Sequence, residues 1–163
     1  MARSPVGVVV DLKMGHTYTN LLYHVVFSTK ERRPLINDDL APRLIQFTGG
    51  IIRERKGKLL AMNGSPDHMH LLGMFVPKMA VSDMVRDIKS LTSAWVRDVF
   101  PNLKQFAWQE GYSAFTVGKS NLDSAMAYIG NQQAHHKKKT FDEELIELLE
   151  RAGIEYDPRY LFD

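Results

Sequence analysis

Residues 59–75, LLAMNGSPDHMHLLGMF, contain two apolar runs on either side of a turn. The turn, Asn63-Gly64-Ser65-Pro66, is made of residues that favour tight reversals of the chain. Residues 59–62 and 68–75 are therefore predicted to be the two strands of a β-hairpin. The segments on either side of this hairpin supply the elements that would complete a sheet around it.

The second predicted strand carries two histidines separated by one residue. Because successive side chains of a strand point to opposite faces, His68 and His70 should share one face, about 7 Å apart along the strand. Met69 and Leu71 should share the other face. Two neutral imidazoles on one face can begin a metal site. On this stretch alone, a pair of histidines with ordinary hydrogen bonds is the simpler explanation.

Further elements flank the hairpin. Residues 20–28 are rich in β-branched and aromatic residues and predict a buried strand, within which His24 should be packed or hydrogen-bonded. Apolar residues at helical spacing predict one helix around residues 40–51 and another that begins near residue 82. The buried face of this second helix should hold Met84, Val85, Ile88, Leu91, Trp95, Val96 and Val99.

The order of the elements indicates the fold class. Two short runs, residues 106–109 and 112–117, follow the second helix, and one or both should join the sheet. The resulting order is β-α-β-β-α-β. It predicts an α+β fold, a ferredoxin-like or RRM-like split β-α-β sandwich with an antiparallel sheet and two helices on one face.

Two more helices are predicted beyond the sheet. Residues 121–139 predict a third helix, which places Tyr128 and Gln132 four residues apart on one face. His135 and His136 follow them and can reach DNA or a metal, but we do not expect either to be a ligand. The acidic C-terminal segment predicts a small amphipathic helix that covers the body of the domain. Its apolar positions are Leu145, Leu148 and Leu149.

The composition is that of one globular domain. The chain has 163 residues, 44% of them hydrophobic and 25% charged, and we assign residues 17–163 to a single domain. Residues 1–16 are an N-terminal extension to which we assign no role. The absence of cysteine excludes disulfides, Cys-ligated zinc and thiol catalysis. No stretch is long enough to span a membrane, so we expect a cytoplasmic protein with no membrane partner.

Basic residues are clustered although the net charge is only +2. Such clusters suit an anionic polymer bound on one side, but each cluster taken alone is also typical of a solvated surface. A nucleic acid would be held through its phosphates. The candidate phosphate-binding residues are Arg32, Arg33, Lys89, Lys137 and Lys138.

Three blocks of sequence together resemble a known family. They are PDHMHLL at residues 66–72, WQEGY at 108–112 and YIGNQQAHH at 128–136. In this order and spacing they resemble the single-tyrosine transposases of the HUH (His-hydrophobic-His) endonuclease superfamily, found in small bacterial insertion sequences and their repeat-associated relatives. The resemblance runs from about Thr17 to the end of the chain.

The resemblance implies a site and a reaction. His68 and His70 match the pair that binds a divalent metal, Mg²⁺ or Mn²⁺; Tyr128 matches the nucleophile, and Gln132 matches the residue that completes the metal site. The implied reaction is cleavage and rejoining of single-stranded DNA through a 5′-phosphotyrosine, with DNA hairpins as the recognised partner. It also implies a homodimer, in which the tyrosine helix of one subunit can serve the histidines of the other.

Two alternatives remain open from the sequence. The same sandwich can serve as a non-catalytic module that binds single-stranded nucleic acid on its sheet. The histidine pair argues against this reading, because a pure binding module needs no metal ligands. The site can also belong to a metal-dependent nuclease that uses water, which would leave Tyr128 without a covalent role.

Overall fold

Four strands form one antiparallel sheet in the order β2-β3-β1-β4 in the computed structural model, which describes residues 16–162. This is the strand order of a ferredoxin-like split β-α-β sandwich and confirms the predicted fold class. The strands are β1 (Leu21–Ser28), β2 (Lys58–Ser65), β3 (His68–Phe75) and β4 (Ser113–Val117). The helices are α1 (Leu40–Glu54), α2 (Val81–Val99), α3 (Leu122–Gly130), α4 (Gln132–His136) and α5 (Phe141–Arg151).

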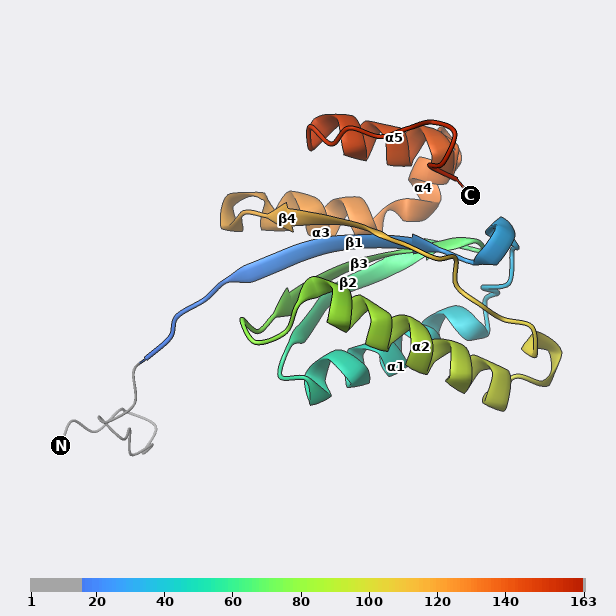
Figure 1. Cartoon of the computed structure of the whole chain (residues 1–163). Coiled ribbons are helices and arrows are strands. Elements are labelled where there is room, and N and C mark those ends of the chain that lie inside the picture. Colours follow the sequence, from blue (N-terminus) through green and yellow to red (C-terminus); the bar gives the residue numbers. More distant parts are fainter. Residues whose placement is uncertain (1–15, 163) are drawn as a thin grey trace.

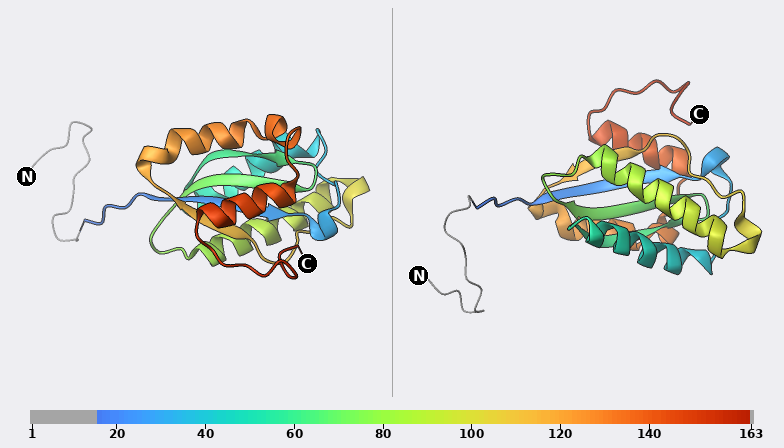
Figure 2. Two further views of the ribbon diagram at one scale, coloured as in Figure 1. Left: turned by 90° about the horizontal axis from the view of Figure 1, so that it is seen from above. Right: turned by 60° about the horizontal axis from the view of Figure 1, so that its bottom comes forward.

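Helices cover both faces of the sheet. Figure 1 shows α1 and α2 on one face and α3, α4 and α5 on the other. The views in Figure 2 show α5 lying across β1, and α1 and α2 side by side beneath the sheet. The sheet therefore lies between two helical layers, and only the α1/α2 layer belongs to the sandwich motif itself.

Strand alternation divides the core into two parts. Met69, Leu71 and Phe75 of β3 point into the larger core, which lies between the sheet and helices α1 and α2. On the other face, Val26 of β1 packs with apolar residues of α5. The face of the sheet under α3, α4 and α5 is the one that carries His68 and His70. The apolar α5 residues are Phe141, Leu145 and Leu149, which confirms that this helix covers the domain.

The hairpin is longer than the sequence indicated. Strand β2 continues through Ser65, so the reversal occurs at Pro66 and Asp67. Ser65 pairs with His68 and Asn63 with His70, and the two histidines are therefore held at the turn end of the hairpin. Strand β1 flanks β3 on its other side, where Val26 lies opposite His70.

Of the two runs after α2, one joins the sheet, as predicted: residues 113–117 form β4, whereas residues 106–109 contribute an isolated bridge between Trp108 and Thr29. Two local predictions were wrong. Leu91 and Val99, expected on the buried face of α2, are exposed. The expected continuous helix over residues 121–139 is interrupted at Asn131, whose backbone leaves the helical region at φ −98° and ψ 20°. Gly130 and Asn131 are weak helix formers, which explains a break at this position.

The N-terminal extension lies almost wholly outside the described residues, which begin at His16. Residues 16–20 precede β1 without helical or strand structure. Among the described helices, none is both long and apolar enough to cross a membrane.

Candidate active site

His68 and His70 lie side by side on β3 and are fully buried beneath α4 and α5. Their Nδ1 atoms are both engaged. His68 Nδ1 lies 2.7 Å from Asp67 Oδ1, and His70 Nδ1 lies 2.9 Å from His24 Nε2. Asp67 is itself held by Arg32, whose Nε is 3.1 Å from Asp67 Oδ2. These contacts fix the orientation of both rings, and their Nε2 atoms face the helices.

Burial keeps these imidazoles neutral. It lowers the pKa of His68 and of His70, because a positive charge would lose its hydration there. The pKa of His24 falls to about 3, from burial and from the adjacent His70. Neutral imidazoles are the form that binds metal ions. His24 is a buried, hydrogen-bonded strand residue, as expected.

Helix α3 brings Tyr128 to the same place. The ring centroids of Tyr128 and His70 are 5.8 Å apart, and Tyr128 is half-buried. Gln132 begins α4 across the break, yet its Nε2 lies 3.4 Å from the Tyr128 carbonyl oxygen, so the two residues remain neighbours. The fully buried Gln132 also accepts a hydrogen bond from His136 at 3.0 Å. The structure therefore brings His68, His70, Tyr128 and Gln132 together.

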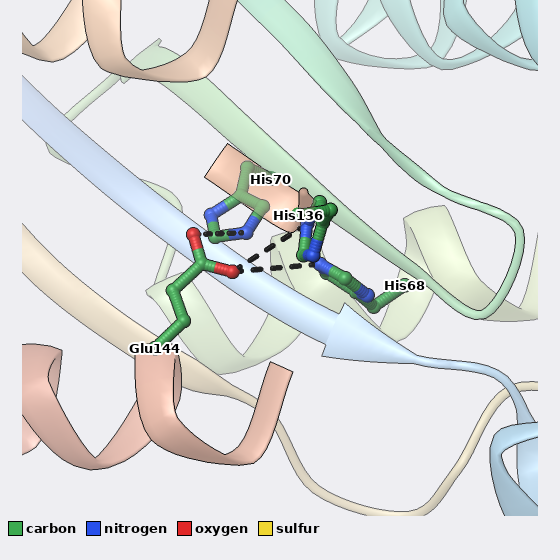
Figure 3. A group of neighbouring side chains, drawn as sticks. All are labelled: His68, His70, His136 and Glu144. Atoms are coloured by element: carbon green, nitrogen blue, oxygen red, sulfur yellow. Dashed lines mark ion pairs between the residues drawn. The ribbon is translucent and has the colours of Figure 1, made fainter. Parts of the chain in front are cut away.

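A carboxylate from α5 lies at the centre of the group. Glu144 Oε1 is 3.3 Å from His70 Nε2, and Glu144 Oε2 is 3.7 Å from His68 Nε2 and 3.6 Å from His136 Nε2. Figure 3 shows the three rings turned toward the two carboxylate oxygens. The Tyr128 hydroxyl donates to Oε1, and Gln132 Nε2 lies 3.2 Å from the same oxygen.

The surroundings keep Glu144 ionised and Tyr128 protonated. Burial opposes the charge on Glu144, but the adjacent His70 and the hydrogen bonds from Tyr128 and Gln132 outweigh it and lower the pKa to about 2. The pKa of Tyr128 is raised by burial, by its hydrogen bond to Glu144 and by the charge of that carboxylate. The phenol is therefore held as a hydrogen-bond donor in this arrangement.

The donor set fits a divalent metal ion. His68 Nε2, His70 Nε2 and Glu144 Oε2 are buried without a hydrogen-bond partner in residues 16–162. Buried polar atoms of this kind are normally satisfied. One candidate ligand atom from each of His68, His70, His136 and Glu144 lies within 4.8 Å of all the others. Imidazole nitrogens and a carboxylate oxygen are common ligands of divalent transition metals.

Two members of this group were not predicted as ligands from the sequence: His136 was placed within reach of a metal but not expected to bind it, and Glu144 was missed. His136 is four residues after Gln132 and eight after Tyr128, which is a helical repeat that would have placed all three on one face. Glu144 falls on the apolar stripe of α5, between Phe141 and Leu145, where a buried carboxylate needs an explanation. The position of Glu144 on this stripe is the feature of the sequence that could have identified it as a site residue.

The predicted phosphate-binding residues lie in different environments. Arg32 pairs with Asp67 and Asp142, and Arg33 Nη1 lies 3.1 Å from Gln105 Oε1. Lys89 donates to the backbone carbonyls of Gln109 and Gly111, and burial lowers its pKa. Lys137 and Lys138 are exposed directly after α4, close in sequence to the site. Of the five, these two lysines are the most accessible.

A surface hollow opens beside Tyr128. Glu144 and Tyr128 form part of its wall, together with the cationic side chains of Lys139 and Arg151. Lys139 and Arg151 both pair with Glu147. The tyrosine can therefore be approached from solvent past basic residues.

Curated transposases are similar to this chain over most of its length. The ISDra2 transposase TnpA of Deinococcus radiodurans is 26% identical over 129 residues, 76% of this chain and 92% of that protein. The transposase for insertion sequence element IS200 of Salmonella typhimurium is 30% identical over 136 residues, 78% of this chain and 86% of that protein.

Solved structures share the fold. A crystal structure of a Deinococcus radiodurans protein assigned as a transposase aligns with a TM-score of 0.59 and 28% identity, over 74% of this chain and 98% of that one. A REP-associated tyrosine transposase bound to a REP hairpin aligns with a TM-score of 0.55 and 16% identity, over 78% of this chain and 74% of that one.

A family model described as "Transposase IS200 like" matches residues 17–132. This segment contains the whole sheet, His68, His70 and Tyr128, and it ends at Gln132. The family cleaves and transfers DNA strands. The chain belongs to the IS200-like transposases, within the HUH tyrosine transposases.

Proposed function

We propose that this transposase cuts and rejoins single-stranded DNA through a covalent 5′-phosphotyrosine at Tyr128. One observation carries the proposal: the Tyr128 hydroxyl and the Nε2 atom of His70 both meet the same oxygen of Glu144. A nucleophile and a candidate metal ligand are thereby held at one point. Such convergence of a nucleophile with electrostatic stabilisers is what acyl or phosphoryl transfer requires.

The proposed reaction exchanges one phosphoester for another. The phenol oxygen of Tyr128 forms a bond to the scissile phosphorus and loses its proton, while the bond to the 3′ oxygen breaks and that oxygen is protonated. A 3′ hydroxyl of another strand then attacks the phosphotyrosine and releases the tyrosine. Because each step makes one phosphoester for each one it breaks, rejoining needs no nucleotide cofactor.

His68, His70 and Gln132 are the residues proposed to hold a divalent ion, Mg²⁺ or Mn²⁺. When bound, the ion would neutralise charge that develops on the scissile phosphate. Asp67 and His24 keep the two imidazoles oriented from behind. The raised pKa of Tyr128 implies that the phenol is a poor nucleophile until the charge of Glu144 beside it is offset.

The proposed partner is single-stranded DNA that carries a hairpin. A REP hairpin is what the structurally similar REP-associated transposase binds. Arg32, Arg33, Lys89, Lys137 and Lys138 are the proposed phosphate contacts, and the two exposed lysines are the best placed. We also propose a cytoplasmic homodimer, although α3 already covers the sheet of its own chain (Figure 2).

A cleavage assay tests the proposal. Purified protein is incubated with end-labelled single-stranded DNA from the sequence flanking its gene, with Mg²⁺ or Mn²⁺, and the products are separated on denaturing gels. We expect wild-type protein to become labelled, EDTA to abolish labelling, and Tyr128→Phe to lower cleavage by at least about 10³-fold. Tyr18→Phe, at a tyrosine that is 90% exposed ahead of β1, should behave as wild type.

The other outcomes identify the alternatives. Cleavage that survives in Tyr128→Phe without labelled protein would show that water is the nucleophile. Tight binding without cleavage on any flanking strand would show a non-catalytic binding module. Either outcome would overturn the phosphotyrosine proposal.

A further inference from the structure

Two side chains of the candidate site lie beyond residues 17–132, the segment that matches the family model. His136 ends α4, and Glu144 projects from the first turns of α5. Both reach the histidine pair because α5 packs its apolar stripe onto β1. This C-terminal layer thus brings additional donor atoms to the site.

We propose that His68, His70, His136 and Glu144 together bind one divalent transition-metal ion, with α5 supplying the carboxylate ligand and with Mn²⁺ preferred to Mg²⁺. The inference deepens the proposed function and rests on its requirement for a metal. It makes α5 part of the metal site and not merely a cover for the sheet.

The separations between the donor atoms have the size that one ion requires. Neighbouring ligand atoms on one ion with bonds of about 2.1 Å lie about 3.0 Å apart in octahedral and about 3.4 Å apart in tetrahedral geometry. The three distances from the Glu144 oxygens to the imidazole Nε2 atoms are 3.3, 3.6 and 3.7 Å. Small inward movements of these side chains would complete the coordination of a single ion.

Contacts to the Nδ1 atoms of the two β3 histidines also leave their Nε2 atoms facing Glu144. Asp67 binds His68 through Nδ1, and His24 meets Nδ1 of His70, so both rings present Nε2 toward Glu144. A carboxylate behind a ligating imidazole is a recurrent support in metal sites. In this ligand set Gln132 positions His136 and Glu144 instead of binding the ion: its Nε2 is 3.2 Å from Glu144 Oε1, and its Oε1 is 3.0 Å from His136 Nε2. Binding of the metal by His136 Nε2 would replace that hydrogen bond to Gln132.

Glu144 also needs a cation that the described chain does not provide. The carboxylate is 4% exposed, and the basic side chains next to it within residues 16–162 are the imidazoles of His68, His70 and His136. No lysine or arginine of that part of the chain forms an ion pair with it. A buried carboxylate is costly unless a positive charge or a metal compensates it. A bound divalent ion would do so.

The ligand set favours Mn²⁺ over Mg²⁺. Mg²⁺ prefers oxygen ligands and keeps several waters, whereas imidazole suits the later divalent metals better. A six-coordinate ion with four protein ligands would retain two positions for phosphate oxygens or water. Zn²⁺, which is usually four-coordinate in such sites, would be saturated by the protein alone.

Metal titration of the full chain tests the ligand set. Protein freed of metal with EDTA is titrated with MnCl₂ and MgCl₂ by calorimetry, and free Mn²⁺ is counted by electron paramagnetic resonance. We expect Mn²⁺ to bind at least about tenfold more tightly than Mg²⁺. Glu144→Gln and His136→Gln should each weaken Mn²⁺ binding by about 10–100-fold, whereas Glu150→Gln on the exposed face of α5 should not.

Wild-type binding of Mn²⁺ by both Glu144→Gln and His136→Gln would overturn the proposal. So would tighter binding of Mg²⁺ than of Mn²⁺. These results would leave strand cleavage by Tyr128 untouched, because that is measured separately on DNA. Conversely, absence of cleavage would refute the proposed function while the metal titration still reports on the ligands.

A crystal structure of wild-type protein loaded with Mn²⁺ gives a test that needs no variant to fold. The anomalous signal of manganese should appear within bonding distance of His136 Nε2 and a Glu144 oxygen, as well as of the two β3 histidines. A manganese peak held by the β3 histidines alone would contradict the assignment.

Discussion

At the scale of single residues, the site depends on pairs of groups that fix each other. His68 and His70 were expected on one face of a strand from a two-residue period, and strand alternation placed them there. Their partner His24 could be named as a packed or hydrogen-bonded residue but not paired with His70, because the two are 46 residues apart and meet only through strand register. Glu144 was missed because long-range packing of α5 positions it.

The buried imidazole of His24 should make stability pH-dependent. Its pKa falls from 6.5 to about 3 on folding, so below pH 6.5 the unfolded chain binds a proton that the folded chain excludes. The free energy of unfolding should therefore fall by about 2 kcal/mol between pH 7 and pH 5 through this group. His24→Phe should remove that part of the slope, as measured by urea unfolding in EDTA at both pH values.

A buried apolar variant provides the control. Val25→Ala, at the next residue of β1, should lower the free energy of unfolding at both pH values and keep the wild-type slope. Parallel pH curves for His24→Phe and wild type would show that His24 does not titrate below its normal range.

At the scale of elements, periodicity predicted the sheet, the two sandwich helices and the C-terminal helix, but not the break between α3 and α4. The runs in β1, β3 and α1 are strongly patterned and bury one face, so their type could be predicted. The helix break at Asn131 depends on two adjacent weak helix formers, Gly130 and Asn131, which the pattern of apolar residues does not register. The break does not separate Tyr128 from Gln132, because both contact Glu144.

The hairpin that carries the histidines requires glycine at position 64. A Cβ atom there would lie 2.1 Å from the His68 carbonyl oxygen and 2.9 Å from the Met69 Cα, both of which are backbone atoms. Gly64→Ala should therefore lower the free energy of unfolding by about 2–3 kcal/mol, as measured by urea titration. Gly50→Ala in α1, where a Cβ meets nothing within 4 Å, should instead raise it by about 0.5–1 kcal/mol. Equal effects of the two substitutions would show that β2 and β3 are not packed as described.

At the scale of the whole molecule, the segment that matches the IS200-like transposases is followed by a C-terminal helical segment that lies against the site. The matched segment ends at Gln132, whereas α4 and α5 supply His136 and Glu144. The resemblance in sequence predicts a reaction and a nucleophile because the residues that carry it lie in short blocks. It could not supply the remaining donors, which depend on how α5 docks.

The basic segment after α4 should contribute to DNA binding in a salt-dependent way. Each lysine that neutralises a phosphate of a single strand adds about 0.7 to the slope of log K against log salt concentration. Replacing Lys137 and Lys138 with alanine should therefore reduce the slope by about 1.4, as measured by fluorescence anisotropy with labelled single-stranded DNA. Lys58→Ala with Lys78→Ala removes two exposed lysines near the end of the hairpin away from His68. An equal loss of slope from that control pair would show that the contribution to DNA binding is not specific to Lys137 and Lys138.

The most direct test of the account is to identify the residue that becomes joined to DNA. Wild-type protein that has reacted with single-stranded DNA is digested with nuclease and protease, and the peptides are sequenced by mass spectrometry. The account predicts a nucleotide attached through its 5′ phosphate to Tyr128, and its disappearance in Tyr128→Phe. Attachment to another residue, or efficient cleavage with no attached nucleotide, would contradict it.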